Sequence, residues 1–427
     1  MTATRVSASE AIFLALVAAL PLMRPVLLQV RTFTIPPADF IFVLAALAAL
    51  VDIVAGRKTV SLSPIVVWVA VYAAALAISA ALSIDRPLSA IKFTGDLYLF
   101  GLTGLALVHV RSLAALRRAL LAWTAGAVVT VAAGAVGLGM FLAGVRDPFN
   151  GNPFLSGHGS LPGGTYPRVM GLFLNPNMYC AYLVASLAIV LTAHQAGWMS
   201  RRAAAVLGTA VVAAGAMSLS PGFGGMLIVI GFAVAGAWKA VQPRLVRAVT
   251  VACAIGAAAF FVAIVASPEP GASVSLHGLR PSSRLLAWSG AVRAFPAHPW
   301  FGKGVGVDVV AIHYVNPAGE HEMLTDAHNT WLSILVQCGA VGLAAFTALT
   351  VALVRGGRAG VEDSTVDRVV AGLLVAFVAG FLYQSLSGSF ENTRHVWMLF
   401  GLLAAATAIR AERLRTGECA ATAASRR

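Results

Sequence analysis

The sequence predicts an all-α polytopic membrane protein with about twelve transmembrane helices. Of its 427 residues, 59% are hydrophobic and only 11% are charged, and the mean hydropathy is +0.84. A soluble protein of this length would need about a quarter of its residues to be charged to cover its surface. Apolar stretches long enough to span a bilayer recur along the chain. Most of the surface is therefore expected to face lipid.

Twelve apolar segments make up the predicted spans. They cover approximately residues 11–29, 38–55, 64–82, 96–110, 119–143, 171–193, 203–219, 223–238, 248–266, 328–354, 369–388 and 395–409. The first segment has no small-residue cleavage site, so we expect it to be a retained span rather than a signal peptide. An even number of spans places both termini on the same side of the membrane.

The basic residues predict the orientation of the chain. Nineteen of the 30 Lys and Arg residues lie in one set of loops and in the C-terminal tail. The positive-inside rule therefore predicts that both termini are cytoplasmic. The net charge of +13 does not indicate nucleic-acid binding, because the basic residues lie between apolar runs and do not interleave with aromatic side chains.

Five parts are expected along the chain. They are transmembrane helices 1–5 in residues 1–143, an outer loop with helices 6–9 in 144–266, a large outer loop in 267–327, helices 10–12 in 328–411 and a cytoplasmic tail in 412–427. The large loop is too aromatic and too patterned for disorder, and long loops in compact proteins are usually functional when they are ordered. The chemistry is therefore expected outside the cytoplasm.

Several classes of function are excluded by missing motifs. The sequence has no phosphate-binding GxxxxGK[ST] loop, and the glycine-rich residues 302–306 lie on the outer side with no strand before them. A nucleotide-driven pump or a kinase is therefore excluded. No histidines have HExxH spacing, no outer loop has a DxD or ExD pair, and the four cysteines lack metal-binding spacing. We expect neither a metal nor a cofactor.

The most informative segment covers residues 282–306. Ser282 or Ser283 can cap a short amphipathic helix that Pro296 ends, and we expect this helix at the outer membrane surface. Arg284 lies in its first turn, one turn before Trp288 on the same face, where the helix start favours an anion. The planar guanidinium suits a diphosphate group. The alternative is that Arg284 only meets lipid phosphates.

A second polar segment opens the tenth predicted span. Thr325 or Asp326 is the expected helix cap, which puts His328 in the first turn, where the helix dipole disfavours a positive charge. A neutral imidazole is a competent general base. Gly339 and Gly342 follow three helical turns later and would permit close packing of a neighbouring helix. The alternative for His328 is an interfacial polar residue without a catalytic role.

A third polar segment leads into the sixth predicted span. Asn175, Pro176 and Asn177 interrupt an apolar run. Non-helical backbone at membrane depth is tolerated only where it is buried in protein or lines a cavity. Arg168 would then stand at the rim of that cavity. The alternative is that the Asn-Pro pair simply marks the true start of the helix.

These segments together resemble the O-antigen ligase and polymerase superfamily. The resemblance covers roughly residues 165–345, and the spans outside it are similar in hydropathy alone. The gap of nine residues between His328-Asn329 and the Gly-x-x-Gly motif is typical of the ligases. The full pattern is Arg284, Trp288, Phe295, His298-Pro299, Gly302, Gly304, Gly306, His328-Asn329, nine residues, and Gly339-x-x-Gly342.

The resemblance implies a fold similar to GT-C-type glycosyltransferases, in the bacterial inner membrane, with the active site and the large loop facing the periplasm. It implies transfer of O-antigen glycan from undecaprenyl diphosphate to a hydroxyl of the lipid A-core oligosaccharide, without nucleotide, nucleic acid or metal. One base and one stabilised leaving group suffice for a single displacement, so inversion is expected. The implied roles are His328 as base, Arg168, Arg284 and Arg280 at the diphosphate, and Asn329, Trp288, Asp326, Gly339 and Gly342 in support.

Three alternatives remain. An O-antigen polymerase would use another lipid-linked repeat as acceptor, and a protein O-oligosaccharyltransferase would use a protein. A secondary transporter would carry weakly repeated halves and charged residues near the bilayer midplane. The predicted spans contain almost no ionisable residues in mid-membrane, and no internal repeat is evident. An enzyme at the outer surface is therefore favoured.

Overall fold

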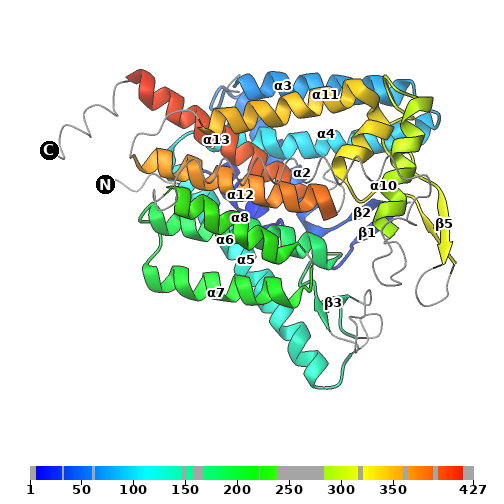
Figure 1. The fold of residues 1–427 in the computed structure, drawn as a ribbon. Coiled ribbons are helices and arrows are strands. Elements are labelled where there is room, and N and C mark those ends of the chain that lie inside the picture. The colour runs from blue at the N-terminus through cyan, green and yellow to red at the C-terminus, as the bar shows by residue number, and fades with distance from the viewer. Residues whose placement is uncertain are drawn as a thin grey trace.

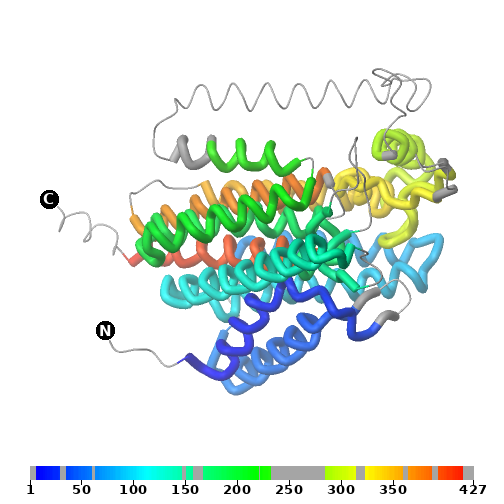
Figure 2. The backbone as a smooth tube through the Cα atoms, turned by 90° about the horizontal axis from the view of Figure 1, so that it is seen from below, coloured from blue at the N-terminus to red at the C-terminus, as the bar shows by residue number. Residues whose placement is uncertain are grey.

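The computed structural model describes residues 6–30, 33–59, 63–146, 151–156, 167–220, 222–237, 283–315, 321–358, 364–387 and 393–416. This part of the chain folds mainly into helices and adds three two-stranded antiparallel sheets, β1–β2, β3–β4 and β5–β6, which the all-α prediction did not include. Figure 1 shows long helices that run in roughly the same direction. The end of α13 lies at one end of the bundle, and α10 and β5 lie at the other (Figure 1 and Figure 2).

The helices and strands follow one another along the chain as follows. They are α1 (Ala8–Ala19), β1 (Leu28–Val30), β2 (Phe33–Ile35), α2 (Pro37–Val54), α3 (Pro64–Ala81), α4 (Arg86–His109), α5 (Leu113–Leu142), β3 (Leu155–Ser156), β4 (Arg168–Val169), α6 (Pro176–Gln195), α7 (Arg201–Met217), α8 (Phe223–Ala237), α10 (Ser283–Ala294), the 3₁₀ helix η2 (Phe295–Ala297), β5 (Ile312–Val315), β6 (His321–Leu324), α11 (Thr330–Arg358), α12 (Thr365–Ser387) and α13 (Arg394–Thr416).

Seven of the described helices are long and apolar enough to cross a membrane: α2, α3, α4, α5, α6, α11 and α12. The chain is therefore a multi-pass membrane protein. Most predicted spans coincide with a helix to within a few residues, but α1 ends at Ala19, well before the predicted end of the first span. The predicted span at 248–266 lies outside the described residues.

Helix α4 begins ten residues earlier than the apolar pattern predicts. Asp85 caps its start, because its carboxylate accepts a hydrogen bond from the backbone N–H of Leu88 at 3.1 Å. The polar first turns are stabilised by an ion pair between buried Lys92 and Asp96, with 2.8 Å between Nζ and Oδ1. The helix cap and the ion pair therefore extend α4 into a segment that hydropathy alone does not predict to be part of the span.

Helix α6 lies at the centre of the bundle. Sixteen of its twenty residues are buried, and it packs against α5, α7, α8 and α12. A helix that is apolar on all sides is expected to be enclosed by other helices. Tyr179 and Tyr182 are fully buried along it. This central helix fixes the position of its own N-terminal end, where Asn175 and Asn177 lie.

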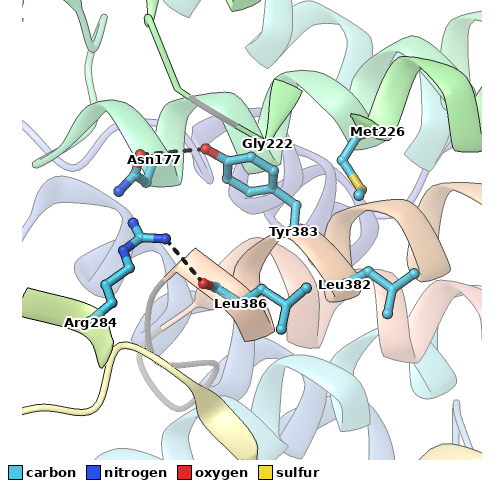
Figure 3. Close-up of a pocket in the computed structure, with 7 residues that line it drawn as sticks. All are labelled: Asn177, Gly222, Met226, Arg284, Leu382, Tyr383 and Leu386. Atoms are coloured by element: carbon cyan, nitrogen blue, oxygen red, sulfur yellow. Dashed lines mark hydrogen bonds between the residues drawn. The ribbon is translucent and has the colours of Figure 1, made fainter. Parts of the chain in front are cut away.

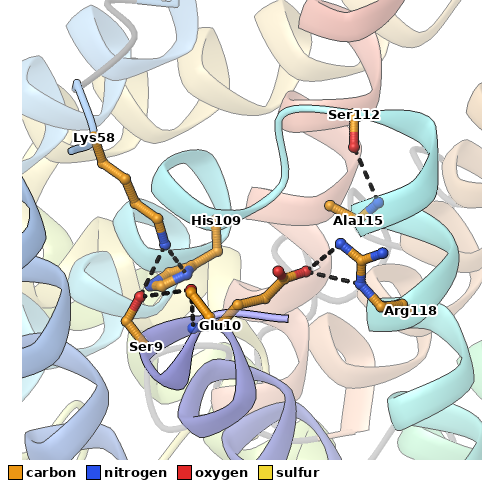
Figure 4. Close-up of polar contacts among 8 residues, drawn as sticks. Ser9, Glu10, Lys58, His109, Ser112, Ala115 and Arg118 are labelled. Carbon is orange, nitrogen blue, oxygen red and sulfur yellow. Dashed lines mark hydrogen bonds and ion pairs between the residues drawn. The ribbon is translucent and has the colours of Figure 1, made fainter. Parts of the chain in front are cut away.

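A polar cluster ties together the ends of α1, α2, α4 and α5 (Figure 4). Lys58, which follows α2, contacts Ser9 of α1 at 3.1 Å and Nδ1 of His109, the last residue of α4, at 2.8 Å. Arg118 of α5 donates two hydrogen bonds to Glu10 at 2.6 and 2.8 Å. These contacts lie at the face that the basic residues predict to be cytoplasmic.

Helix α11 is broken at Gly339, whose backbone has φ 67° and ψ −168°. In an intact α-helix the carbonyls of Val336 and Gln337 would accept from the N–H groups four residues later. Here Lys303 N–H donates to Val336 O at 3.0 Å. Gly304 N–H donates to Gln337 O, also at 3.0 Å. Residues 299–304, which begin with a turn, therefore replace the missing helical donors.

The same segment also supplies the missing acceptors. Ala340 N–H donates to Pro299 O at 2.8 Å, and Val341 N–H donates to Trp300 O at 3.1 Å. These are the two N–H groups whose helical acceptors the break removes. Buried backbone groups without a partner are costly, above all in a membrane protein. The break in α11 and the segment 299–304 therefore stabilise each other.

Two glycines permit this close approach. A Cβ atom on Gly302 would lie 2.2 Å from the Gln337 carbonyl, and one on Gly339 would lie 2.3 Å from the Trp300 carbonyl. Both glycines also have φ near +70°. The expectation that Gly339 and Gly342 pack against a neighbouring helix is corrected, because Gly339 meets the segment 299–304 and Gly342 meets Cys338 of its own helix.

We predict that Gly339→Ala destabilises the protein strongly. The backbone conformation of Gly339 is one that essentially only glycine adopts, and alanine there costs about 1–3 kcal/mol. Its Cβ would also collide with backbone atoms. The matched control is Gly104→Ala within α4, where a Cβ meets nothing within 4 Å. Thermal unfolding in detergent should show a lower midpoint for Gly339→Ala and an unchanged one for Gly104→Ala. Equal midpoints would contradict the role assigned to the break.

Candidate functional site

A small pocket lies where the start of α6, the start of α8, the start of α10 and the end of α12 meet. Its volume is about 100 Å³ (Figure 3). One part of its wall is apolar, and the other carries an amide, a guanidinium and a phenol. The lining residues are Asn177, Gly222, Met226, Arg284, Leu382, Tyr383 and Leu386.

Arg284 lies in the first turn of α10, as the sequence predicts, and lines this pocket. Its Nη1 donates to the carbonyl of Leu386 at the end of α12, at 3.3 Å. Among the residues that the structure describes, no carboxylate lies within ion-pair distance of Arg284. The guanidinium therefore brings a positive charge to the pocket that none of these carboxylates neutralises.

Arg168 lies beside the same pocket, on β4. Pairing with Ser156 of β3 sets its register. Its Nε donates to Ser218 O at 3.1 Å, and Nη2 lies 3.5 Å from Oδ1 of Asn177. Burial lowers the pKa of the Arg168 guanidinium, and the positive charge of Arg284 lowers it further. Arg168 and Arg284 thus bring two positive charges to one region of the molecule, which favours an anion.

The Asn-Pro pair marks the start of α6. Asn175 is the N-cap, with its side chain accepting from the backbone N–H of Met178 at 2.8 Å, and Pro176 occupies the first helical position. The prediction of interrupted backbone inside the sixth span is therefore wrong, and the alternative interpretation is right. Asn177, the next residue, turns its side chain to the pocket.

His328 lies just before α11 rather than in its first turn. Helix α11 begins at Thr330, and the cap is Asn329, whose Oδ1 accepts from the N–H groups of Trp331 at 3.0 Å and Leu332 at 3.3 Å. His328 itself has a left-handed backbone, with φ 49°. The predicted caps, Thr325 and Asp326, are therefore corrected to Asn329.

Asp326 instead orients the histidine. Its Oδ1 accepts from His328 N–H at 3.2 Å and from Ser333 Oγ at 3.3 Å, and Oδ2 lies 3.4 Å from His328 Nδ1. Burial acts to raise the pKa of Asp326, but its contacts with His328 outweigh burial and hold the pKa below its usual value. A carboxylate at Nδ1 favours the tautomer whose Nε2 can accept a proton. The His328 side chain is 44% exposed, so a substrate can reach it.

Helix α10 connects the arginine pocket to this Asp-His pair. Trp288 lies one turn after Arg284, about 6 Å along the helix axis. Its Nε1 donates to the carbonyl of Ala327 at 2.9 Å, directly before His328. One helix therefore positions a guanidinium at the pocket and fixes the backbone beside the imidazole.

The apolar face of α10 packs against protein. Ala287 and Ala291 are fully buried in a cluster with Val309, Val310 and Leu332. The sequence placed this face at the membrane surface, and that expectation is corrected. Sequence periodicity identifies an apolar face but cannot tell whether lipid or protein covers it.

The structure thus gathers the predicted residues into two groups. Arg168 and Arg284 lie at the pocket, and Asp326, His328 and Asn329 lie at the start of α11, while Arg280 is outside the described residues. Sequence reasoning did not select Asn177, Ser220 or Tyr383 as site residues. Of these three residues, the sequence could have indicated only Asn177, because it is polar and lies beside the Asn-Pro pair. No sequence pattern connects Tyr383 on α12 with α6. Within the described chain, no group of three or more His, Cys, Asp and Glu side chains could hold a metal ion.

Part of the chain is similar to a known protein family. Residues 180–347 match the family model described as O-antigen ligase. The matched region runs from α6 into α11 and contains Arg284, Asp326 and His328, while Arg168 and Asn177 lie just before it. A search of curated proteins gave no match. The match over α6 to α11 supports membership of this multi-pass membrane protein in the O-antigen ligase superfamily, and it indicates a glycosyltransferase-type enzyme, a ligase or a polymerase.

Proposed function

We propose that the protein transfers O-antigen glycan from undecaprenyl diphosphate to a hydroxyl of the lipid A-core oligosaccharide. One observation carries the proposal: α10 holds an arginine pocket and an Asp-His pair beside each other. A glycosyl transfer of this kind needs a site for an anionic leaving group and a base for the incoming hydroxyl. The family match supports a glycan ligase or polymerase.

The leaving group is the donor diphosphate. Arg284 and Arg168 bind its oxygens, with Arg280 as a further proposed contact, because a guanidinium presents two parallel N–H donors to phosphate oxygens. As the bond between the sugar C1 and the phosphate oxygen breaks, negative charge builds up on the diphosphate. Fixed positive groups stabilise that charge more in the transition state than in the ground state. Neither a nucleotide nor a divalent metal is needed.

The nucleophile is the acceptor hydroxyl. His328 Nε2 takes its proton while the hydroxyl oxygen forms the new bond to C1 from the face opposite the diphosphate. The electron pair of the broken C1–O bond leaves with the diphosphate. A single displacement inverts the anomeric configuration. Asp326 acts through the imidazole and does not contact the sugar.

The proposed setting is the bacterial inner membrane, with this site at the periplasmic face and both termini in the cytoplasm. The basic residues support this orientation, since α10 lies at the opposite end of the bundle from the end of α13 (Figure 1), whose last turn carries Arg413 and Arg415. A polymerase would use the same chemistry on a lipid-linked acceptor.

We predict that lysine cannot replace the pocket arginines. Arg284→Lys and Arg168→Lys keep the charge but lose the paired donors, so the rate at low donor concentration should fall about tenfold or more. Arg293→Lys is the matched control, because Arg293 lies on the same helix and is exposed. The measurement is glycan transfer by purified protein. Unchanged rates in both pocket variants would contradict the proposed diphosphate binding and would favour contact of these arginines with lipid headgroups.

We also predict that His328→Ala loses about two to four orders of magnitude in rate, the usual contribution of a positioned base, while donor binding persists. Asp326→Ala should lose much less, since Asp326 orients the imidazole. The assays contain excess chelator, because the proposed reaction requires no metal. NMR measures the anomeric configuration of the product. A retained configuration, or normal turnover by His328→Ala, would refute this mechanism.

A further inference from the structure

The side chain of Asn177 is held in one orientation by three donors. Its Oδ1 lies 3.1 Å from Ser220 Oγ, 3.4 Å from the hydroxyl of Tyr383 and 3.5 Å from Nη2 of Arg168. These groups come from the loop before α8, from α12 and from β4. Three separate elements therefore converge on one amide oxygen at the second position of α6.

These contacts indicate which end of the Asn177 amide is the oxygen and which is the NH₂ group. A carboxamide has one accepting oxygen and one NH₂ group that only donates. An arginine can only donate, so the contact with Arg168 requires the amide oxygen on this side. The hydroxyls of Tyr383 and Ser220, which can donate or accept, then donate to the same oxygen. The NH₂ group is thereby turned the other way. Figure 3 shows it on the side of the Arg284 guanidinium.

Two donor groups consequently face each other across the pocket. The Asn177 NH₂ and the Arg284 guanidinium can only donate, and neither can accept from the other. Arg284 uses one of its N–H groups for the Leu386 carbonyl and has others left for a ligand. The pocket volume of about 100 Å³ leaves room for an acceptor group between them. The start of α6 adds a partial positive charge at the same place. An anion with more than one oxygen can accept hydrogen bonds from both donor groups, and the start of α6 attracts it.

We propose that Asn177 binds the diphosphate of the lipid-linked donor together with Arg284, and that Tyr383 and Ser220 are positioning residues that fix the amide. This inference rests on the proposed function and adds to it a neutral donor that no sequence motif identified. The Asn177 NH₂ group carries no charge, so it does not attract anions at a distance. It contributes a hydrogen bond, and this contribution is therefore specific to oxygen-rich anions.

The test measures binding of farnesyl diphosphate to the full-length protein in detergent. Asn177→Ala should weaken binding about tenfold or more, the usual effect of losing a hydrogen bond to a charged group. Asn177→Asp keeps the shape but removes the NH₂ group and adds a negative charge, so binding should weaken further. Arg293→Lys, an exposed position of α10 outside the pocket, is the control and should bind as wild type does.

A second variant tests the positioning role. Tyr383→Phe keeps the ring and removes the hydroxyl, so the amide loses one of its three donors. We expect KM for the lipid-linked donor to rise several-fold, with little change in KM for the acceptor. A merely structural role would instead change kcat and both KM values together. Thermal unfolding of each variant verifies that it is folded.

The outcomes separate the two proposals. If wild type binds farnesyl diphosphate and folded Asn177→Ala and Asn177→Asp bind it equally well, the inference about Asn177 fails and the proposed function stands. If wild type does not bind farnesyl diphosphate, both fail. Competition with phosphatidylglycerol vesicles distinguishes the source of the phosphate: equal displacement by this lipid would show a headgroup site and overturn the inference.

Discussion

The exchange of backbone hydrogen bonds between the broken α11 and residues 299–304 is the constraint on which the site depends. Two carbonyls and two N–H groups lose their helical partners at Gly339, and residues 299–304 replace all four partners. Low-polarity surroundings make such groups expensive to leave unpaired. The segment is therefore fixed in one register, and through the short helix η2 it fixes the end of α10 that precedes it.

A fixed α10 explains how residues far apart in the sequence act together. Its first turn reaches the ends of α6 and α12 through Arg284, and its next turn holds the backbone before His328 through Trp288. The positive pocket and the half-exposed imidazole are then set at a defined separation. A glycosyl transfer depends on the distance between these two sites more than on either site alone. The leaving group and the incoming hydroxyl must lie on opposite faces of one sugar carbon.

The sequence predicted the helices well and the long-range contacts poorly. Pro37 and Pro64 start helices close to where the apolar runs begin, and Arg284 and His328 stand out because charged and polar groups are rare in this chain. The cap of α11 was missed because Thr325, Asp326 and Asn329 are all good caps and tertiary contacts decide among them. The contact of Tyr383 with α6 spans more than 200 residues, so no local pattern encodes it.

The lipopolysaccharide of a strain that lacks this protein tests the central claim most directly. Gel electrophoresis should show bare core in the deletion strain while polymer accumulates on the lipid carrier. Wild-type protein should restore the polymer-bearing bands, and His328→Ala should not. Core that carries a single repeat would indicate a polymerase, and an unchanged lipopolysaccharide would contradict the assignment of this protein as the ligase.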